Sequence, residues 1–301
     1  MSYFFRRLFH FEKFDEAQVV RGKTTPESNS GSFAPKGGRA AGDKGTPGPG
    51  QQGGYTMLAP VVHEALVNVR DTIKRWATKA IGKLKQPGVV DKATLLHHAT
   101  ISKPIYDTLM KGVAAAMGGD LLMGNNSVMQ LAQEIEGGRQ IERPVVMVAD
   151  IKGGPRLDEK AKLDYGGDWS MMKDMVRGTI LVPKADKLDD ALEALERAGI
   201  KIATEPKDRV NNPGPEGYRD LKLNVELDNG HIAEVQVMTP EIFVAKILKA
   251  HHLYAEIRPL ISTLEAEKRE PTPEEWKLIE RNNYRQKVEL YDPAWAKDLQ
   301  V

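Results

Sequence analysis

Two alternating runs on either side of residue 229 carry the side chains best suited to chemistry. The runs LKLNVEL and HIAEVQVM are joined by Asp-Asn-Gly at 228–230, a tripeptide typical of a β-hairpin turn. Because side chains alternate across a strand, Lys222 and Asn224 should share one face of the hairpin with Glu234 and Gln236, while leucine and valine fill the other. A sheet packed on one side and wet on the other gives the same alternation, so the pattern alone does not define a site.

The segments before the hairpin favour a functional site over a plain wet surface. A glycine-rich loop ends at Gly217-Tyr218, immediately before the first strand, and the segment from Lys173 to Arg177 places Asp174 near an arginine at the start of an earlier strand-like run. The adjacent histidines at 97–98 and 251–252 are not expected to bind metal. Neighbouring residues on a helix point about 100° apart, and the sequence has no His-Glu-x-x-His spacing.

These groups must be positioned by a sheet with helices around it. Strand-like runs occupy 145–151, 174–182, 201–204 and the two arms of the hairpin, and helical periodicity is found at 57–85, 105–117, 127–136, 184–199, 240–258 and 271–286. Asn126 or Ser127 is the expected cap of the third helix. The order of elements predicts an α+β fold with a mixed β-sheet of about five strands flanked by helices.

Composition excludes several classes of protein. The chain has 301 residues, a formal net charge of +1 and no cysteine, so disulfides, thiolate metal sites and cysteine nucleophiles are absent. The charge balance gives no general attraction to nucleic acid or membranes. No run reaches the roughly 18 to 20 apolar residues of a spanning helix, and no secretory signal is visible. We therefore expect a cytoplasmic protein with no membrane partner.

The two ends differ from the middle. Six of the seven phenylalanines lie in the first 33 residues, which suggests a Phe-rich arm over 1–21 that either packs on its own domain or docks on a protein partner. A Gly/Pro-rich linker, expected to be disordered, covers 22–56. A helical region (57–140), a central α+β domain (141–262) and a helical tail (263–301) complete the predicted organisation.

Four short motifs, in order, resemble those of the RelA/SpoT synthetase family. They are Asp174 at a strand start, Lys207-Asp208 before a loop, Gly217-Tyr218-Arg219-Asp220 at the next strand, and Glu234-Val235-Gln236 on the strand after it. Ala245, a histidine at 251 or 252, and Tyr254 echo the family's next helix. The resemblance extends from about Val145 to Arg258 and implies a nucleotidyltransferase-like synthetase fold.

The resemblance also implies roles for individual residues. Asp174 and Glu234 match the family's metal-binding aspartate and catalytic glutamate, so both are candidate catalytic residues and Mg²⁺ ligands, because Mg²⁺ prefers carboxylate oxygen. Tyr218 matches the aromatic that stacks on the acceptor base. Plain surface carboxylates and a core tyrosine are the alternatives. The remaining candidate substrate-binding residues are Lys152, Arg156, Lys160, Lys162, Arg177, Lys207, Arg219, Lys222 and Gln236.

The candidate substrate-binding residues do not all carry the same weight. Lys152, Arg156, Lys160 and Lys162 correspond to the family's phosphate-binding group, which suits a polyphosphate, although a solvated helix face would look the same. Gln236 is expected to support Glu234. Lys222 stands where the family commonly has a histidine that contacts the acceptor, and this departure leaves the acceptor open.

The implied activity is transfer of pyrophosphate from ATP to the 3′ hydroxyl of a guanine or adenine nucleotide, as in alarmone synthesis, catalysed by a Mg²⁺-dependent transferase. The expected partners are ATP and the acceptor nucleotide, such as GDP, GTP or an adenine nucleotide. Two alternatives remain: the same chemistry on a tRNA 3′ end, as in toxin-like members of the family, or a non-catalytic protein that keeps the fold for binding or assembly. No His-Asp dipeptide occurs, so the family's hydrolase domain is not expected.

Overall fold

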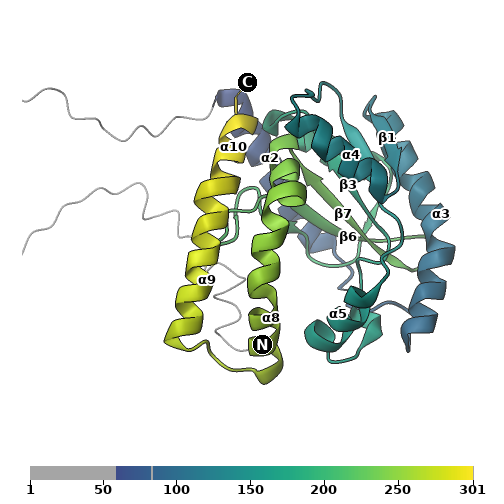
Figure 1. The fold of residues 1–301 in the computed structure, drawn as a ribbon. Coiled ribbons are helices and arrows are strands. Elements are labelled where there is room, and N and C mark those ends of the chain that lie inside the picture. The colour runs from purple at the N-terminus through teal and green to yellow at the C-terminus, as the bar shows by residue number, and fades with distance from the viewer. Residues whose placement is uncertain (1–58, 83, 301) are drawn as a thin grey trace, which may run out of the picture.

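The computed structural model describes residues 59–300 except residue 83. The expected Phe-rich arm and the expected linker both lie outside the described residues. Within this range no helix combines the length and apolarity that crossing a bilayer requires. Figure 1 shows the strands between α3 on one side and α8, α9 and α10 on the other.

A single mixed sheet forms the centre of the described part. Its strands run in the order β1-β2-β3-β7-β6-β4, with β5 also paired to β6. The pairs β1–β2 and β3–β7 are parallel and the others are antiparallel. The strands are β1 (Asp120–Met123), β2 (Val145–Val148), β3 (Arg177–Leu181), β4 (Lys201–Ile202), β5 (Lys207–Asp208), β6 (Leu221–Glu226) and β7 (Ile232–Met238).

The predicted α+β fold with a mixed sheet is confirmed, although the described sheet has seven strands instead of about five. The two additional strands are β1 and β5, which have four and two residues. Neither segment contains a β-branched or aromatic residue, the feature that marks the equally short β2 and β4 as strands in the sequence.

Helices precede, interrupt and follow the sheet. The predicted helix over 105–117 is the second half of α3, which begins earlier because Asp91 and Thr94 form a reciprocal capping box. The predicted cap of α4 is wrong: the N-cap is Gly124, with φ of 85°. The helices are α2 (Pro60–Lys79), α3 (Lys92–Ala116), α4 (Asn125–Glu136), α5 (Pro155–Tyr165), α6 (Leu188–Arg197), α7 (Pro240–Val244), the π-helix η4 (Ala245–Ala250), α8 (His251–Glu267), α9 (Pro273–Arg285), the π-helix η5 (Gln286–Tyr291) and α10 (Asp292–Asp298), with 3-10 turns η2 (Trp169–Met171) and η3 (Ala185–Lys187).

The apolar face of the sheet packs closely on α3. The α3 helix packs on β1 and β2, leucine and valine side chains of β6 and β7 are buried, and the Tyr106 hydroxyl of α3 donates a hydrogen bond of 2.8 Å to the backbone oxygen of Glu234. A Cβ atom on Gly178 would lie 2.8 Å from that hydroxyl oxygen and 2.7 Å from the Met147 carbonyl oxygen. Glycine at 178 therefore allows α3 to approach β3, the strand that follows Asp174 in the sequence.

Helices from both ends of the described range share one hydrophobic core with the sheet. The cluster includes Val69 of α2, Leu192 of α6, Val235 of β7 and Trp295 of α10. Burial of these side chains supplies the main stabilising term, at roughly 25 cal/mol per Å² of apolar surface removed from water. The sheet is thus held from both sides.

His231, just before β7, should make stability depend on pH. Its ring is 1% exposed, and neither ring nitrogen has a hydrogen-bond partner among the described residues. Burial, with a smaller effect of His98, lowers the pKa of His231 to about 4. An unfolded histidine has a pKa of about 6.5, so the unfolded state binds more protons between these values. Stability should fall as the pH drops from about 6.5 to about 4, by roughly 3 kcal/mol from this group.

The measurement is the free energy of unfolding in urea at several pH values. The variant His231→Phe should lose this destabilising part, so on going from pH 6.5 to pH 4 its free energy of unfolding should end about 3 kcal/mol higher, relative to its own value at pH 6.5, than that of the wild type. The variant His97→Phe, at an exposed position, is the control and should follow the wild type. Parallel curves for His231→Phe and wild type would show that His231 is not the responsible group.

Candidate active site

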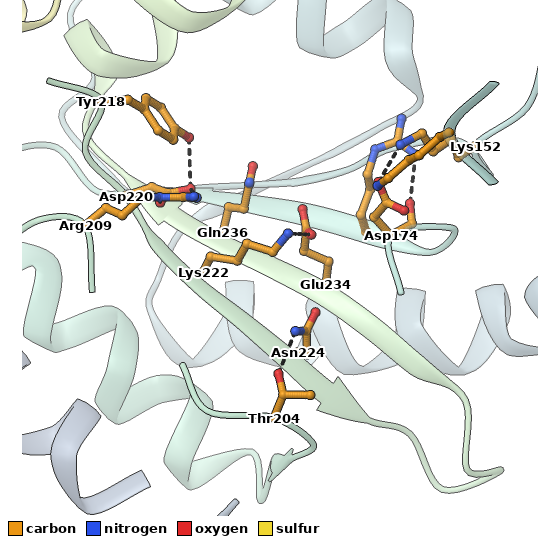
Figure 2. A network of polar contacts seen from close by, with 12 residues as sticks. Lys152, Asp174, Thr204, Arg209, Tyr218, Asp220, Lys222, Asn224, Glu234 and Gln236 are labelled. Atoms are coloured by element: carbon orange, nitrogen blue, oxygen red, sulfur yellow. Dashed lines mark hydrogen bonds and ion pairs between the residues drawn. The ribbon is translucent and has the colours of Figure 1, made fainter. Parts of the chain in front are cut away.

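Strand register brings the predicted polar side chains to one face of the sheet. Lys222 lies opposite Gln236, and Asn224 lies opposite Glu234, across β6 and β7. Arg177 lies opposite Glu234 across β3 and β7. Directly opposed residues point to the same side of a sheet, so these side chains share one surface, as the alternation predicts. Figure 2 shows Lys222, Glu234 and Gln236 between Asp174 and Tyr218.

Asp174 is held by two lysines from another part of the chain. Lys160 of α5 donates to the Asp174 Oδ2 atom over 2.7 Å, and Lys152, from the loop before α5, donates to the same oxygen. Burial acts to raise the pKa of Asp174, but the charges of Lys160 and Lys152 outweigh it and hold that pKa well below its usual value. Burial acts to lower the pKa of Lys160, yet attraction to Asp174 raises it to about 12. The Asp174 carboxylate is therefore ionised at neutral pH.

Glu234 is paired in the same way. Lys222, diagonally across from it on β6, forms an ion pair with the Glu234 Oε2 atom, and only 8% of the Glu234 side chain is exposed. Lys207, in register with Lys222 on β5, adds positive charge, and burial together with repulsion from Lys222 lowers the pKa of Lys207. Burial and the same lysine also lower the pKa of Lys173. Ammonium groups are therefore crowded around the two carboxylates.

The two carboxylates fit a divalent cation. The Asp174 Oδ1 atom is buried and has no hydrogen-bond partner among the described residues. The charges of Asp174 and Glu234 both raise the pKa of Lys160, with Asp174 having the larger effect. No group of three or more His, Cys, Asp or Glu side chains able to hold a metal occurs in the described range. Mg²⁺ in nucleotide enzymes is commonly held by one or two carboxylates plus phosphate oxygens, and this donor set matches that pattern.

Tyr218 lies at the other end of the polar face and is enclosed by the chain itself. Its residue is 8% exposed, and its hydroxyl donates to the Asp220 Oδ2 atom over 2.9 Å. The Tyr291 ring of η5 lies 5.3 Å away, centroid to centroid. The Arg209 guanidinium lies 5.0 Å and the Lys246 Nζ atom 5.6 Å from the Tyr218 centroid. In this conformation the ring is packed within the protein, so stacking on a base stays a prediction.

A buried ion pair supports Tyr218 from below. Arg209 donates two hydrogen bonds to Asp220, of 2.6 and 2.9 Å, and the Asp220 side chain is fully buried. Burial acts to lower the pKa of Arg209, but Asp220 outweighs it and raises that pKa above its usual value. The two-pronged geometry fixes the loop before β6 to the sheet.

Not every predicted residue reaches this face. Arg219 donates to the Val210 backbone oxygen and lies 5.0 Å from the Trp295 ring centroid, so it binds the loop to α10. Lys162 is exposed on α5, two residues and therefore about 200° of helix rotation from Lys160. Arg156 lies in the first turn of α5, but its side chain is outside the described residues. Arg177 reaches the Asp174 backbone oxygen over 3.4 Å.

Three residues on or beside this face lie outside the four motifs, although alternation in the hairpin predicts the position of Asn224. Arg209 stands in the glycine-rich loop, Asn224 lies opposite Glu234, and Lys246 belongs to η4. The Asn224 amide donates to the Thr204 Oγ1 atom over 2.7 Å, and its Oδ1 atom is buried with no partner among the described residues. Lys246 had one visible signal, because it is a charge inside the otherwise apolar run IFVAKIL.

Two buried polar contacts hold the site segments in place. Gln86 donates to the backbone oxygens of Met172 and Ile232 over 3.0 and 2.8 Å, and accepts from the Ile232 nitrogen. It thus ties the chain just before Asp174 to the start of β7. Asp298 accepts a hydrogen bond of 2.6 Å from Thr239 at the end of β7, and burial raises the pKa of Asp298 to about 7.

Part of the chain is similar in sequence to a known protein. No protein-family model matches the chain. A stretch of 101 residues, 34% of the chain, is 34% identical to the (p)ppApp synthetase toxin Tas1 of Pseudomonas aeruginosa (strain UCBPP-PA14), and the match spans 22% of that protein's length. The similarity confirms the resemblance to the RelA/SpoT synthetases that the four motifs indicate.

Solved structures also align with the chain. A crystal structure of the complex between the Type VI effector Tas1 and its immunity protein is 23% identical, with a TM-score of 0.43, and the alignment covers 69% of this chain and 99% of that one. A structure of the small alarmone synthetase 1 from Bacillus subtilis bound to its product pppGpp is 16% identical, with a TM-score of 0.34, covering 68% of this chain and 98% of that one.

The buried pair beneath Tyr218 gives a direct test of the geometry. The variant Arg209→Met leaves the Asp220 carboxylate buried without its charge partner, so it should lower the free energy of unfolding by about 3 to 5 kcal/mol. The control Arg197→Met removes an exposed ion pair with Glu193 and should change stability by less than about 1 kcal/mol. Urea unfolding at pH 7 measures both. Equal stabilities for the two variants would contradict a buried role for Arg209.

Proposed function

We propose that this chain transfers a pyrophosphoryl group from ATP to the 3′ hydroxyl of a guanine or adenine nucleotide. The observation that carries the proposal is the polar sheet face on which Asp174 and Glu234 are each neutralised by lysine. The sequence similarity to a (p)ppApp synthetase toxin supports the same reaction class. Because the chain spans only about a fifth of that relative, the acceptor and the activity are proposed for this chain on its own residues.

The lysines suit a polyphosphate. Lys152 and Lys160 both contact Asp174, and 25% and 17% of their side chains are exposed, so their ammonium groups lie at an accessible edge. A triphosphate carries several negative charges and can accept their hydrogen bonds in place of the carboxylate. The lysines would then hold ATP while the carboxylate oxygens become free.

The freed carboxylates are placed to hold the cation that accompanies ATP. Asp174 supplies its unpartnered Oδ1 atom and Glu234 its carboxylate from the neighbouring strand. When bound, Mg²⁺ would neutralise phosphate charge and orient the phosphates. Arg177 and Lys173 lie beside the same region and add to the electrostatic stabilisation of the transferring group.

The reaction is balanced without any other reactant. The acceptor 3′ oxygen forms a bond to the β-phosphorus of ATP, and the bond between that phosphorus and the oxygen bridging to the α-phosphorus breaks. AMP leaves with that oxygen, and the proton of the 3′ hydroxyl passes to a base. Glu234 is the base that we assign, because its carboxylate lies at the centre of the polar face and a positioned carboxylate can accept a proton during transfer.

A product assay tests the proposal. The protein is incubated with γ-labelled ATP, with or without Mg²⁺, in the presence of ADP, GDP or tRNA, and the products are separated by chromatography. Label on a mononucleotide, with an equal amount of AMP and only with Mg²⁺, is the expected result. Label on tRNA would assign the RNA acceptor that Lys222, in place of a histidine, leaves open. No transfer to any acceptor would favour a non-catalytic role.

The variant Glu234→Gln should abolish or strongly reduce transfer. The amide oxygen still accepts from Lys222, but it cannot take the hydroxyl proton, so turnover should fall by roughly 10²- to 10⁴-fold. The control Glu226→Gln, at the far end of β6, should keep near wild-type turnover. Rates come from the same chromatography, and thermal unfolding checks that both variants fold. Undiminished transfer by Glu234→Gln would remove Glu234 from the reaction.

A further inference from the structure

Lys246 reaches the polar face from a π-helix. The helix that follows β7 begins as α7, widens into η4, where Lys246 is the second residue, and continues as α8. Its Nζ atom donates to the Gln236 Oε1 atom over 2.6 Å and lies 5.6 Å from the Tyr218 ring centroid. Irregular π-turns inside helices are often found at functional sites.

The Lys246 ammonium has no ion-pair partner of its own among the described residues. The nearby carboxylates are already engaged, since Asp220 is bound by Arg209 and Glu234 by Lys222. Lys246 is partly buried, and burial lowers its pKa in spite of attraction to Asp220 and Glu234. A shielded ammonium whose direct partner is a neutral amide is costly unless an anion joins it.

Another lysine of the same helix shows the difference. The Lys249 side chain is 45% exposed and pairs with Glu136 of α4 over 2.9 Å. That arrangement is the usual one for a surface lysine, and such a pair contributes little to stability. Lys246 and Lys249 therefore share an element but differ in environment.

The position of Lys246 along the sheet decides which part of a substrate it meets. Lys152 and Lys160 gather at Asp174, at one end of the polar face, whereas Gln236 and Tyr218 lie toward the other end. Lys246 contacts both of the latter residues. A cation at this end is separate from the group that we assign to the triphosphate of ATP.

We propose that Lys246 binds the 5′-phosphate groups of the acceptor nucleotide. The inference rests on the proposed function, because it assigns the Tyr218 end of the face to the acceptor. An ammonium can give two hydrogen bonds to phosphate oxygens while it keeps its bond to Gln236. Lys246 is then a substrate-binding residue that orients the acceptor toward Glu234.

The test compares Lys246→Met with Lys246→Arg and with the control Lys249→Met. Binding of ADP and GDP is measured by calorimetry while a non-hydrolysable ATP analogue and Mg²⁺ saturate the donor end. Lys246→Met keeps the apolar stem and should weaken diphosphate binding by about 10- to 100-fold, as expected for loss of a charged hydrogen bond. Lys246→Arg should restore most of the affinity, and Lys249→Met should match the wild type.

The same titrations separate the possible failures. Binding of the ATP analogue alone should be unchanged in Lys246→Met. If that variant weakens the ATP analogue and spares the diphosphates, Lys246 belongs to the donor end and the inference is wrong. If it only lowers the melting temperature with affinities unchanged, the residue is structural and the inference is again wrong. A wild-type protein that binds neither ligand overturns the proposed function as well, whereas intact ATP binding with unaltered diphosphate affinity in Lys246→Met overturns only the role of Lys246.

Discussion

The balance between buried carboxylates and lysine charges on one sheet face is the interaction on which the rest of the structure depends. Asp174 and Glu234 are both shielded from water, and without Lys152, Lys160 and Lys222 beside them their ionised forms would be costly. The pairing keeps the Asp174 carboxylate charged at neutral pH. It also places cations and anions next to each other. A bound polyphosphate could pair with the lysines while its metal pairs with the carboxylates, so that no buried charge is left without a partner.

The positions of these charged side chains depend on the register of the strands and on contacts that hold the strands in place. The parallel pairing of β3 with β7 sets Arg177 against Glu234, and glycine at 178 lets α3 pack directly beneath. Gln86 ties the segment before Asp174 to β7 through three hydrogen bonds. On the far side, η5 and α10 cover the loop that carries Tyr218, and Asp298 fixes the last helix to the end of β7. Elements distant in sequence thus determine a small polar surface.

The sequence predicted the features that depend on local pattern. Alternation in the hairpin predicted the polar face, and the motif order singled out Asp174 and Glu234, which lie on it or at its edge. Lys222 was singled out as the position where the family commonly has a histidine, and it lies on the same face. The pairing of Lys152 and Lys160 with Asp174 could not be predicted from the sequence, because it depends on how α5 packs against the start of β3 in the folded protein. Tyr218 packs against Tyr291, and Arg219 lies over the Trp295 ring. Both contacts depend on where the C-terminal helices pack, which short sequence motifs do not reveal. Lys246 was missed because a π-helix changes which side chains face the sheet.

The proposed function requires that ATP and its metal replace the lysine-carboxylate pairs. A crystal structure of the protein with a non-hydrolysable ATP analogue and Mg²⁺ tests this most directly. Oxygens of both Asp174 and Glu234 should then lie at about 2.1 Å from one Mg²⁺ ion, and Lys152 and Lys160 should contact the phosphates. An analogue bound elsewhere, with the ion pairs at Asp174 and Glu234 intact, would contradict it.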